Sequence, residues 1–301
     1  MNGILILDKP AGFTSFDAVA VMRGLTHEKK IGHTGTLDPM ATGVLPLLLG
    51  CATRANALLP DTDKEYEAGF RLGIATDTQD TTGKTTDESD RGASREAVEA
   101  ALGAFRGEIL QVPPMVSAIS VGGKRLYDLA RQGIEVEREP RPVTIRELEL
   151  LSYDEPSRSG ALRIACSKGT YIRTLCADLG EALHTYGVMS SLRRTRASGF
   201  TLADSVTLDR AKELAEEGRL AERLLPVKSL FSGMPAVAVS PAQAARFQNG
   251  GALDLERTAL RRALPAEDAV FRVQGPDGAF LGLGRASAGQ LRVLRLFRGA
   301  E

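Results

Sequence analysis

The 301-residue chain contains no tryptophan, only three cysteines and three histidines, and no net charge. Cys51, Cys166 and Cys176 are odd in number and never spaced C-x-x-C, which argues against a disulfide framework and a zinc knuckle. The longest apolar run, VLPLLL at residues 44–49, is far shorter than the roughly 20 residues of a membrane span. The N-terminus lacks the basic flank and long apolar region of a signal peptide. We therefore expect a cytoplasmic protein with reduced cysteines and no membrane attachment.

The common cofactor and hydrolase signatures are also missing. The letters GKT at residues 83–85 resemble the end of a P-loop, but Thr78 stands where the earlier glycine is required. His27 does not begin an H-E-x-x-H motif, and Ser120 lacks the glycine two positions before it that a nucleophile elbow needs. We expect no cofactor and no metal, and serine-dependent or metal-dependent hydrolysis loses support.

Charge is spread unevenly along this neutral chain. Residues 61–100 carry eleven acids and five bases, whereas residues 161–200 carry two acids and six bases. The stretch 278–300 has no acid and four arginines: Arg285, Arg292, Arg295 and Arg298. Nucleic-acid binding depends on where charge lies rather than on its sum, so a basic face is compatible with zero net charge.

Strand-like and helix-like segments alternate along the chain, which indicates an α+β fold with a mixed central sheet and flanking helices. A Gly/Pro break at residues 230–235 precedes a small segment of different texture, so we place a domain boundary near residue 232. Residues 113–142 form an apparent insertion with a short helix around residues 127–131. Periodicity and turn residues predict strands over residues 4–7, 65–75, 146–152, 162–167, 270–273, 279–283 and 291–297. They predict helices over residues 16–25, 94–105, 171–183, 208–217 and 241–248, the first with Ser15 as its N-cap. A long loop is expected over residues 30–45.

One loop is conspicuous, with the letters GHTGTLDPMATG at residues 32–43. On pattern alone Asp38 is best explained as a turn residue, since Asp-Pro frequently begins turns. His33 is equally explained as a loop hydrogen-bond partner, Tyr66 as a core aromatic residue and Arg173 as a surface ion-pair partner. No single residue establishes a function.

Four motifs taken together change this interpretation. They are LDKPAGFTS at residues 7–15, HTGTLDPMATGVL at 33–45, KEY at 64–66 and CSKGTYIRTL at 166–175. In order and spacing, from residue 2 to about residue 200, they resemble the TruB family of bacterial tRNA pseudouridine-55 synthases. Residues 113–118 and 124–133 resemble the family's RNA-binding thumb insertion. The letters FLGLG at 280–284 and the basic strand that follows resemble a PUA domain.

The resemblance implies a catalytic domain at residues 1–232, with the thumb insertion at about 113–142, and a PUA-like RNA-binding domain at 233–301. It also implies the reaction: uridine-55 in the T loop of tRNA is flipped out and isomerised to pseudouridine, without redox centre, metal or ATP. Asp38 would act as nucleophile or as base on the ribose, and Arg173 would be its partner in a buried ion pair. Tyr66 would be the aromatic platform for the extruded base.

The family assigns smaller roles to further residues. His33 would help fill the space left by the flipped base, and Leu192 would line the uracil pocket. Lys9 and Asp80 lie in family motifs, where the sequence does not separate a substrate or catalytic role from loop anchoring. Each basic side chain could also be a solvated surface charge, but phosphate contacts are expected from Lys124, Arg125, Arg131, Arg193, Arg194, Arg196 and the C-terminal arginines.

Two other functions stay open at this point. One is a noncatalytic RNA-binding or tRNA-folding protein that uses the same groove, and the other is a carboxylate-dependent hydrolase. The presence of Asp38, Tyr66 and Arg173 favours the enzyme over a binding protein that has lost its catalytic residues, although a tRNA-folding role could accompany catalysis. The hydrolase lacks a second carboxylate in any recognisable spacing. We expect a monomer whose partner is the T arm of tRNA.

Overall fold

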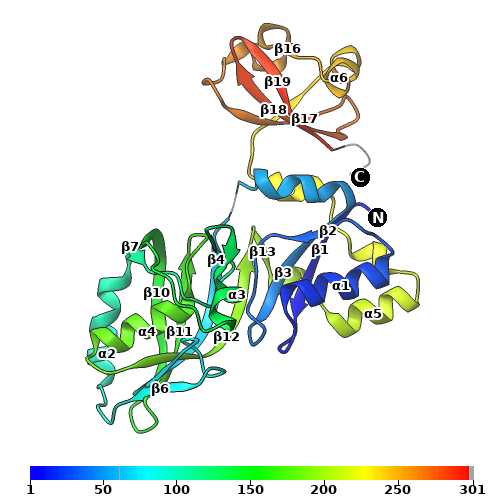
Figure 1. Cartoon of the computed structure of the whole chain (residues 1–301). Coiled ribbons are helices and arrows are strands. Elements are labelled where there is room, and N and C mark those ends of the chain that lie inside the picture. Colours follow the sequence, from blue (N-terminus) through cyan, green and yellow to red (C-terminus); the bar gives the residue numbers. More distant parts are fainter. Residues whose placement is uncertain (61, 298–301) are drawn as a thin grey trace.

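The computed structural model describes residues 1–60 and 62–297, in which a large mixed sheet is followed by a small C-terminal sheet (Figure 1). Ten strands of the described residues form the large sheet, with antiparallel and parallel neighbours, so the predicted α+β class is confirmed. In spatial order these strands are β14 (Val206–Thr207), β1 (Gly3–Lys9), β3 (Thr42–Leu49), β12 (Gly187–Ala197), β4 (Lys64–Leu72), β11 (Ser159–Cys166), β10 (Arg141–Asp154) and β7 (Gly107–Gln111), with β2 (Ile31–His33) paired to β3 and β13 (Phe200–Thr201) paired to β12.

Helices pack in pairs against this sheet. The helices α1 (Ser15–Thr26) and α5 (Leu208–Glu216) lie beside the half that contains β1, whereas α2 (Arg95–Leu102) and α4 (Ile172–Ala182) lie beside the half that contains β10 (Figure 1). The hairpin of β5 (Ile74–Thr76) and β6 (Thr85–Glu88) extends from the end of β4. None of the helices in the described residues is long and apolar enough to cross a membrane.

The start of α1 differs from the prediction in one functional detail. Thr14, not Ser15, is the N-cap: its side chain accepts a hydrogen bond from the Asp17 N–H, and the Asp17 carboxylate accepts from the Thr14 N–H in return. This reciprocal capping leaves the Ser15 hydroxyl free for another contact. Ser15 is buried and bonds to the loop that carries Asp38.

The predicted loop over residues 30–45 is also too long. Residues 31–33 and 42–49 form β2 and β3, which pair with each other, so only residues 34–41 form the loop. Glycine and threonine obscure these strands in the sequence, yet Gly43 has a structural reason. Its φ is +105°, and an added Cβ would lie 2.2 Å from the Arg194 carbonyl oxygen of the neighbouring β12. Glycine therefore allows the close pairing of β3 with β12.

The strand β12 at the centre of the large sheet is not predicted by the sequence. It pairs with β4 along most of its length and with β3 at Arg193 and Arg194. Its serines and arginines hide the apolar alternation, since Met189, Leu192 and Arg194 all lie buried. A buried arginine gives no hydrophobic signal, and the register also shifts twice along this strand.

The segment expected to be an insertion and the C-terminal part are small units of their own. The former contains β8 (Ser120–Val121), β9 (Lys124–Arg125) and α3 (Leu126–Arg131), which begins one residue before the expected helix. The latter follows η5 (Val227–Phe231) and is β-rich as predicted; residues 298–301, with Arg298, lie outside the described residues. Its elements are β15 (Ala236–Ala238), α6 (Pro241–Gln248), β16 (Leu253–Asp254), β17 (Val270–Gln274), β18 (Phe280–Ser287) and β19 (Gln290–Leu296).

An aromatic cluster joins the two sheets. The Phe231 ring centroid lies 6.0 Å from that of Phe280 and 5.8 Å from that of Phe297, and the same apolar cluster includes Ile4 and Ile6 of β1. Rings at these distances stabilise beyond their buried area. Phe231 is fully buried and is therefore the anchor between the C-terminal domain and the large sheet.

Phe231→Ala is expected to lower the free energy of unfolding by about 3–5 kcal/mol, because it removes a fully buried ring and leaves a cavity between the two sheets. Urea denaturation followed by circular dichroism measures this loss. Phe16→Ala removes the same ring from an exposed position and should cost less than about 1 kcal/mol. Equal losses in the two variants would show that the cluster does not stabilise the fold.

Candidate active site

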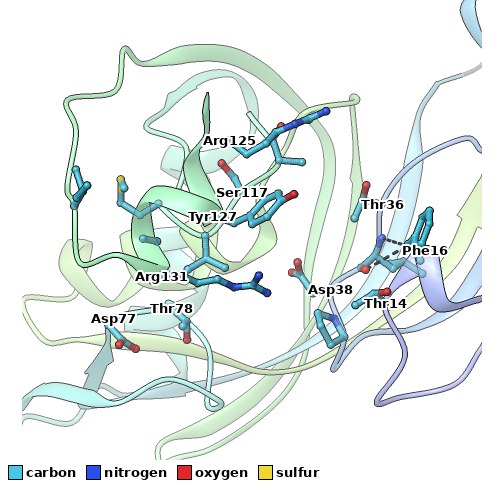
Figure 2. A pocket seen from close by; sticks show the side chains of 18 of the residues that line it. Thr14, Phe16, Thr36, Asp38, Asp77, Thr78, Ser117, Arg125, Tyr127 and Arg131 are labelled. Atoms are coloured by element: carbon cyan, nitrogen blue, oxygen red, sulfur yellow. Dashed lines mark hydrogen bonds between the residues drawn. The ribbon is translucent and has the colours of Figure 1, made fainter. Parts of the chain in front are cut away.

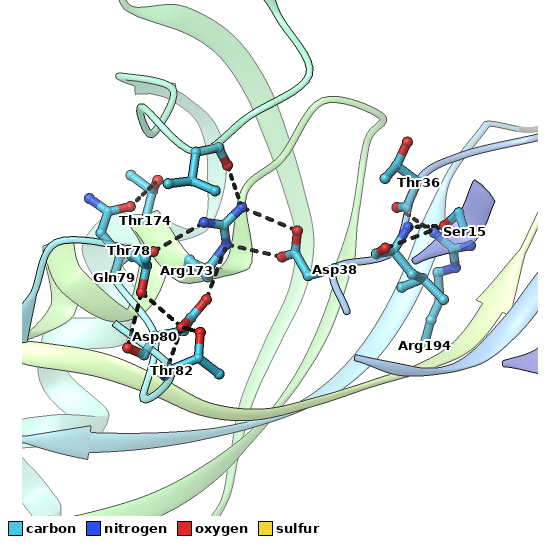
Figure 3. Close-up of polar contacts among 12 residues, drawn as sticks. Ser15, Thr36, Asp38, Thr78, Gln79, Asp80, Thr82, Arg173, Thr174 and Arg194 are labelled. Carbon is cyan, nitrogen blue, oxygen red and sulfur yellow. Dashed lines mark hydrogen bonds and ion pairs between the residues drawn. The ribbon is translucent and has the colours of Figure 1, made fainter. Parts of the chain in front are cut away.

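Asp38 lies on the loop 34–41 between β2 and β3. The Ser15 hydroxyl holds this loop, since its oxygen accepts from the Leu37 N–H at 2.8 Å and the hydroxyl lies 3.3 Å from the Leu37 carbonyl. The Asp38 carbonyl accepts from the Ala41 N–H at 3.0 Å, which makes the expected turn with backbone atoms alone. The carboxylate is therefore not used by the turn and points instead toward Arg173 (Figure 3).

Arg173, in the first turn of α4, binds both oxygens of the Asp38 carboxylate through two nitrogens of its guanidinium. Arg173 Nε lies 3.0 Å from Asp38 Oδ2, and Nη2 lies 3.3 Å from Oδ1. The same guanidinium donates to the Thr78 carbonyl at 3.1 Å and the Val116 carbonyl at 2.8 Å. Its side chain is 5% exposed, against 32% for Asp38, so the predicted buried pair has one buried member and one that faces a cavity. Arg173 thus joins three loops around the carboxylate.

Asp80 anchors the loop that supplies the Thr78 carbonyl. It is buried, and its Oδ1 accepts from the Thr78 hydroxyl and the Thr82 N–H, both at 2.9 Å (Figure 3). Its other oxygen lies 3.9 Å from Arg173 Nε. Asp80 therefore holds the loop and adds negative charge behind Arg173, which supports the anchoring alternative left open by the sequence.

Lys9 has an anchoring role of the same kind. Its buried Nζ donates to the carbonyls of Pro10 at 2.8 Å and Phe13 at 2.6 Å, and lies 3.4 Å from that of Pro39. Burial lowers the pKa of Lys9 to about 8, while the Asp38 charge partly opposes this. Its ammonium ties the turn before α1 to the residue after Asp38, and these three contacts place it in the loop rather than on substrate.

A pocket of about 250 Å³ opens beside the Asp38 carboxylate. Its walls include Tyr66 and Leu192, both buried, which lie on the neighbouring central strands β4 and β12. Burial raises the pKa of Tyr66 to about 12, so its phenol keeps its proton at neutral pH. The pocket is slightly smaller than the about 300–1,000 Å³ of typical small-molecule sites, which fits a single nucleoside.

A second, wider cleft of about 1,090 Å³ meets the pocket at Asp38. The start of α1 forms one wall, and the segment with α3 forms the other, where Arg125, Tyr127 and Arg131 lie (Figure 2). The Arg131 guanidinium carbon lies 5.6 Å from the Tyr127 ring centroid, which holds both side chains on the wall. Lys124 is exposed on β9 nearby.

His33 lies at the end of β2 and also lines the wide cleft. Burial lowers the pKa of His33 below its usual value, and the positive Arg194 adds to this effect. A lowered pKa favours the neutral imidazole, which adds no positive charge to the cleft.

The other predicted basic residues divide into two kinds. Arg194 is fully buried and donates to the carbonyls of Val44 at 2.7 Å, Gly35 at 3.0 Å and Thr36 at 3.3 Å (Figure 3). The expectation that Arg194 contacts phosphate is wrong. Its three hydrogen bonds hold the loop that carries Asp38. Arg193 pairs with Asp8 at 2.8 Å, but its side chain is partly exposed and therefore remains accessible.

Arg196 is partly exposed, and Arg285, Arg292 and Arg295 are exposed, as expected of phosphate contacts or of solvated charges. Arg196 pairs with Glu65 at 2.5 Å, and Arg285 lies 3.7 Å from Asp268. Arg292 and Arg295 lie on β19. In the described part of the chain, no three His, Cys, Asp or Glu residues are grouped to hold a metal ion.

The backbone partners of Arg173 and the contact of Ser15 are not predicted by the sequence. Carbonyl groups carry no side-chain signal, so neither Thr78 nor Val116 could be singled out from the letters. The sequence predicts Ser15 only as a helix cap, whereas its hydroxyl binds the loop that carries Asp38.

Known proteins are similar to this chain in sequence and in fold. Family models match residues 23–172 (TruB family pseudouridylate synthase, N-terminal domain), 173–232 (tRNA pseudouridylate synthase B C-terminal domain) and 235–297 (pseudouridine synthase II TruB, C-terminal). A protein named tRNA pseudouridine synthase B from Burkholderia mallei strain NCTC 10247 is 47% identical over 98% of this chain and 97% of its own length. The chain belongs to the TruB family. A relative of the same name from Azoarcus sp. strain BH72 is 45% identical over 98% of this chain and 95% of its own.

Solved structures extend the TruB likeness to the fold. A chain in the crystal structure of a Cbf5-Nop10-Gar1 complex superposes with a TM-score of 0.75 and 25% identity, and the match covers 98% of this chain and 84% of that one. The family and the enzyme class predicted from the motifs, a tRNA pseudouridine synthase, are thus confirmed.

Proposed function

We propose that the chain isomerises uridine-55 in the T loop of tRNA to pseudouridine, with Asp38 as the catalytic carboxylate. The observation that carries this proposal is the position of that carboxylate. It is held by a buried arginine at the junction of a wide cleft and a nucleoside-sized pocket. An RNA loop fits the cleft, and one nucleotide flipped from it reaches the pocket past Asp38.

The proposed chemistry uses the groups in the pocket as they lie. The C1′–N1 bond breaks, the uracil turns, and a C1′–C5 bond forms, while C5 loses a proton and N1 gains one. Asp38, ionised beside Arg173, either attacks C1′ or removes a ribose proton. Tyr66 and Leu192 line the pocket. The Tyr66 ring stacks on the flipped uracil, and Leu192 forms an apolar wall beside which the uracil turns.

The remaining parts of the proposal concern RNA binding. Arg125, Arg131 and Lys124 on the thumb insertion contact phosphates on one side of the cleft, and the C-terminal PUA-like domain adds arginines outside it. We propose that the active species is a monomer bound to the T arm of one tRNA. An accompanying tRNA-folding role needs only the binding surfaces and stays a prediction.

Incubation with a T-arm stem-loop RNA, followed by nucleoside analysis, tests this function. The expected product is an isomer of uridine with unchanged mass at position 55, and RNA with cytidine at that position should stay unmodified. Release of free uracil would favour the hydrolase, and unmodified RNA despite tight binding would favour the noncatalytic binder.

Tyr66 offers a prediction with a built-in comparison. Tyr66→Phe should bind RNA well because the ring survives, whereas Tyr66→Leu should weaken capture of the flipped base by roughly 1–3 kcal/mol. The phenol pKa of about 12 lies well above neutral pH, so loss of the hydroxyl should leave the pH–rate profile unchanged from about pH 6 to 9. Quenched single-turnover assays at varied enzyme concentration and pH measure the capture of the base and the pH–rate profile. A Phe variant as slow as the Leu variant would show that the hydroxyl takes part in the chemistry.

A further inference from the structure

A large aromatic ring lies at the mouth of the cleft without a role in the site described above. Phe16 is the second residue of α1 and is 64% exposed. It lines the same cleft as Asp38, on the wall opposite Tyr127 and Arg131 (Figure 2). Single exposed apolar residues are common on protein surfaces, but this ring lies where the proposed function places RNA.

The ring is held at a fixed position relative to the catalytic carboxylate. Ser15, its neighbour in sequence, bonds to both backbone groups of Leu37, the residue before Asp38. The cap formed by Thr14 and Asp17 fixes the first turn of α1 on the other side of Phe16. A side chain on this rigid turn can therefore set the position of RNA relative to Asp38.

A cation covers one side of the ring. The Arg23 guanidinium carbon lies 5.6 Å from the Phe16 ring centroid, and Arg23 is held in turn by the Ile31 carbonyl at 3.5 Å. Because most of the ring surface stays exposed, a second planar group can stack on it from the cleft. Arginine and aromatic planes are the surfaces on which proteins stack unpaired bases.

We propose that Phe16 stacks on a second nucleobase of the RNA loop, next to the uridine that enters the pocket. This inference rests on the proposed function, because the cleft must hold RNA. The partner is not the target uridine: Phe16 does not line the 250 Å³ pocket, which holds that base. Flipping one nucleotide removes a stacking partner from its neighbours, and an exposed aromatic ring replaces it. Phe16 is thus a positioning residue that holds the RNA loop while the uridine reacts.

The test measures binding and chemistry separately. Affinity for a T-arm stem-loop is measured by fluorescence anisotropy for Phe16→Ala and Phe16→Tyr, each combined with Asp38→Asn so that the RNA stays unmodified. Single-turnover rates at saturating enzyme are measured for the two Phe16 variants alone. Leu110→Ala is the matched control, because Leu110 is 68% exposed and lies on β7, outside the cleft and outside the segments that the proposed function assigns to RNA binding. A second series of RNAs carries one abasic site at each loop position except the target.

Phe16→Ala should weaken binding by about 5-fold to 150-fold, the loss of one base–aromatic stack, with the saturated rate within about twofold of the parent. Phe16→Tyr and Leu110→Ala should match the parent. For one abasic RNA the Phe16→Ala effect should disappear, which identifies the stacked base. Unchanged binding of Phe16→Ala, equal losses in the Ala and Tyr variants, or the same loss with every abasic RNA would each overturn the inference. Absence of pseudouridine with the parent protein would instead refute the proposed function, since the binding comparison does not depend on turnover.

Discussion

Asp38→Asn is expected to abolish pseudouridine formation while affinity for a T-arm stem-loop stays within about twofold of the parent protein. The amide has the size of the carboxylate but is neither a base nor an oxygen nucleophile. The fold should tolerate it, because Ser15 and Lys9 hold the loop independently of the carboxylate. Arg173 keeps the carbonyls of Thr78 and Val116 as partners. Nucleoside analysis and fluorescence anisotropy measure the two effects.

Asp77→Asn provides the matched control for this experiment. Asp77 faces the same wide cleft, but its carboxylate accepts a hydrogen bond from the Lys84 N–H at 2.8 Å instead of pairing with a buried cation. Both variants remove one negative charge from the cleft, and only Asp38→Asn should stop the reaction. Pseudouridine formation by Asp38→Asn at a rate close to that of Asp77→Asn would remove Asp38 from the chemistry.

The residues that meet at the site were predictable because their motifs are short and contiguous. Asp38, Tyr66 and Arg173 lie far apart in the chain, and no periodicity brings them together; the family resemblance did. The sequence alone favoured a turn for Asp38. The structure shows why both descriptions apply: the backbone of Asp38 makes the turn, and its side chain is left for Arg173.

What could not be predicted is mostly backbone geometry and buried charge. The strand β12 supplies Leu192 to the pocket and Arg194 to the loop of Asp38, yet its mixture of serine and arginine masks the strand period. The sequence does not distinguish an arginine that is buried and bonded to three carbonyls from one that is exposed and binds phosphate. The strongly local elements, such as α4 and α5, agree with prediction to within about two residues at each end.

Arg173→Lys is expected to lower the single-turnover rate by about 100-fold or more with RNA affinity little changed. An ammonium cannot bind both Asp38 oxygens and two carbonyls from different loops, so the carboxylate loses its fixed position. Arg173→Met should be slower still, because it leaves Asp38 beside an apolar side chain with no cation.

Arg163→Lys is the control: Arg163 pairs with Glu149 at 3.1 Å on the exposed surface, and its replacement should change neither rate nor affinity. If Arg173 were one phosphate contact among many, Arg173→Met would weaken binding and reduce its salt dependence by about one contact, while the rate at saturating enzyme stayed at the parent value. The single-turnover rate and the salt dependence of RNA affinity, measured together, therefore decide whether this buried guanidinium positions the carboxylate or binds the RNA backbone.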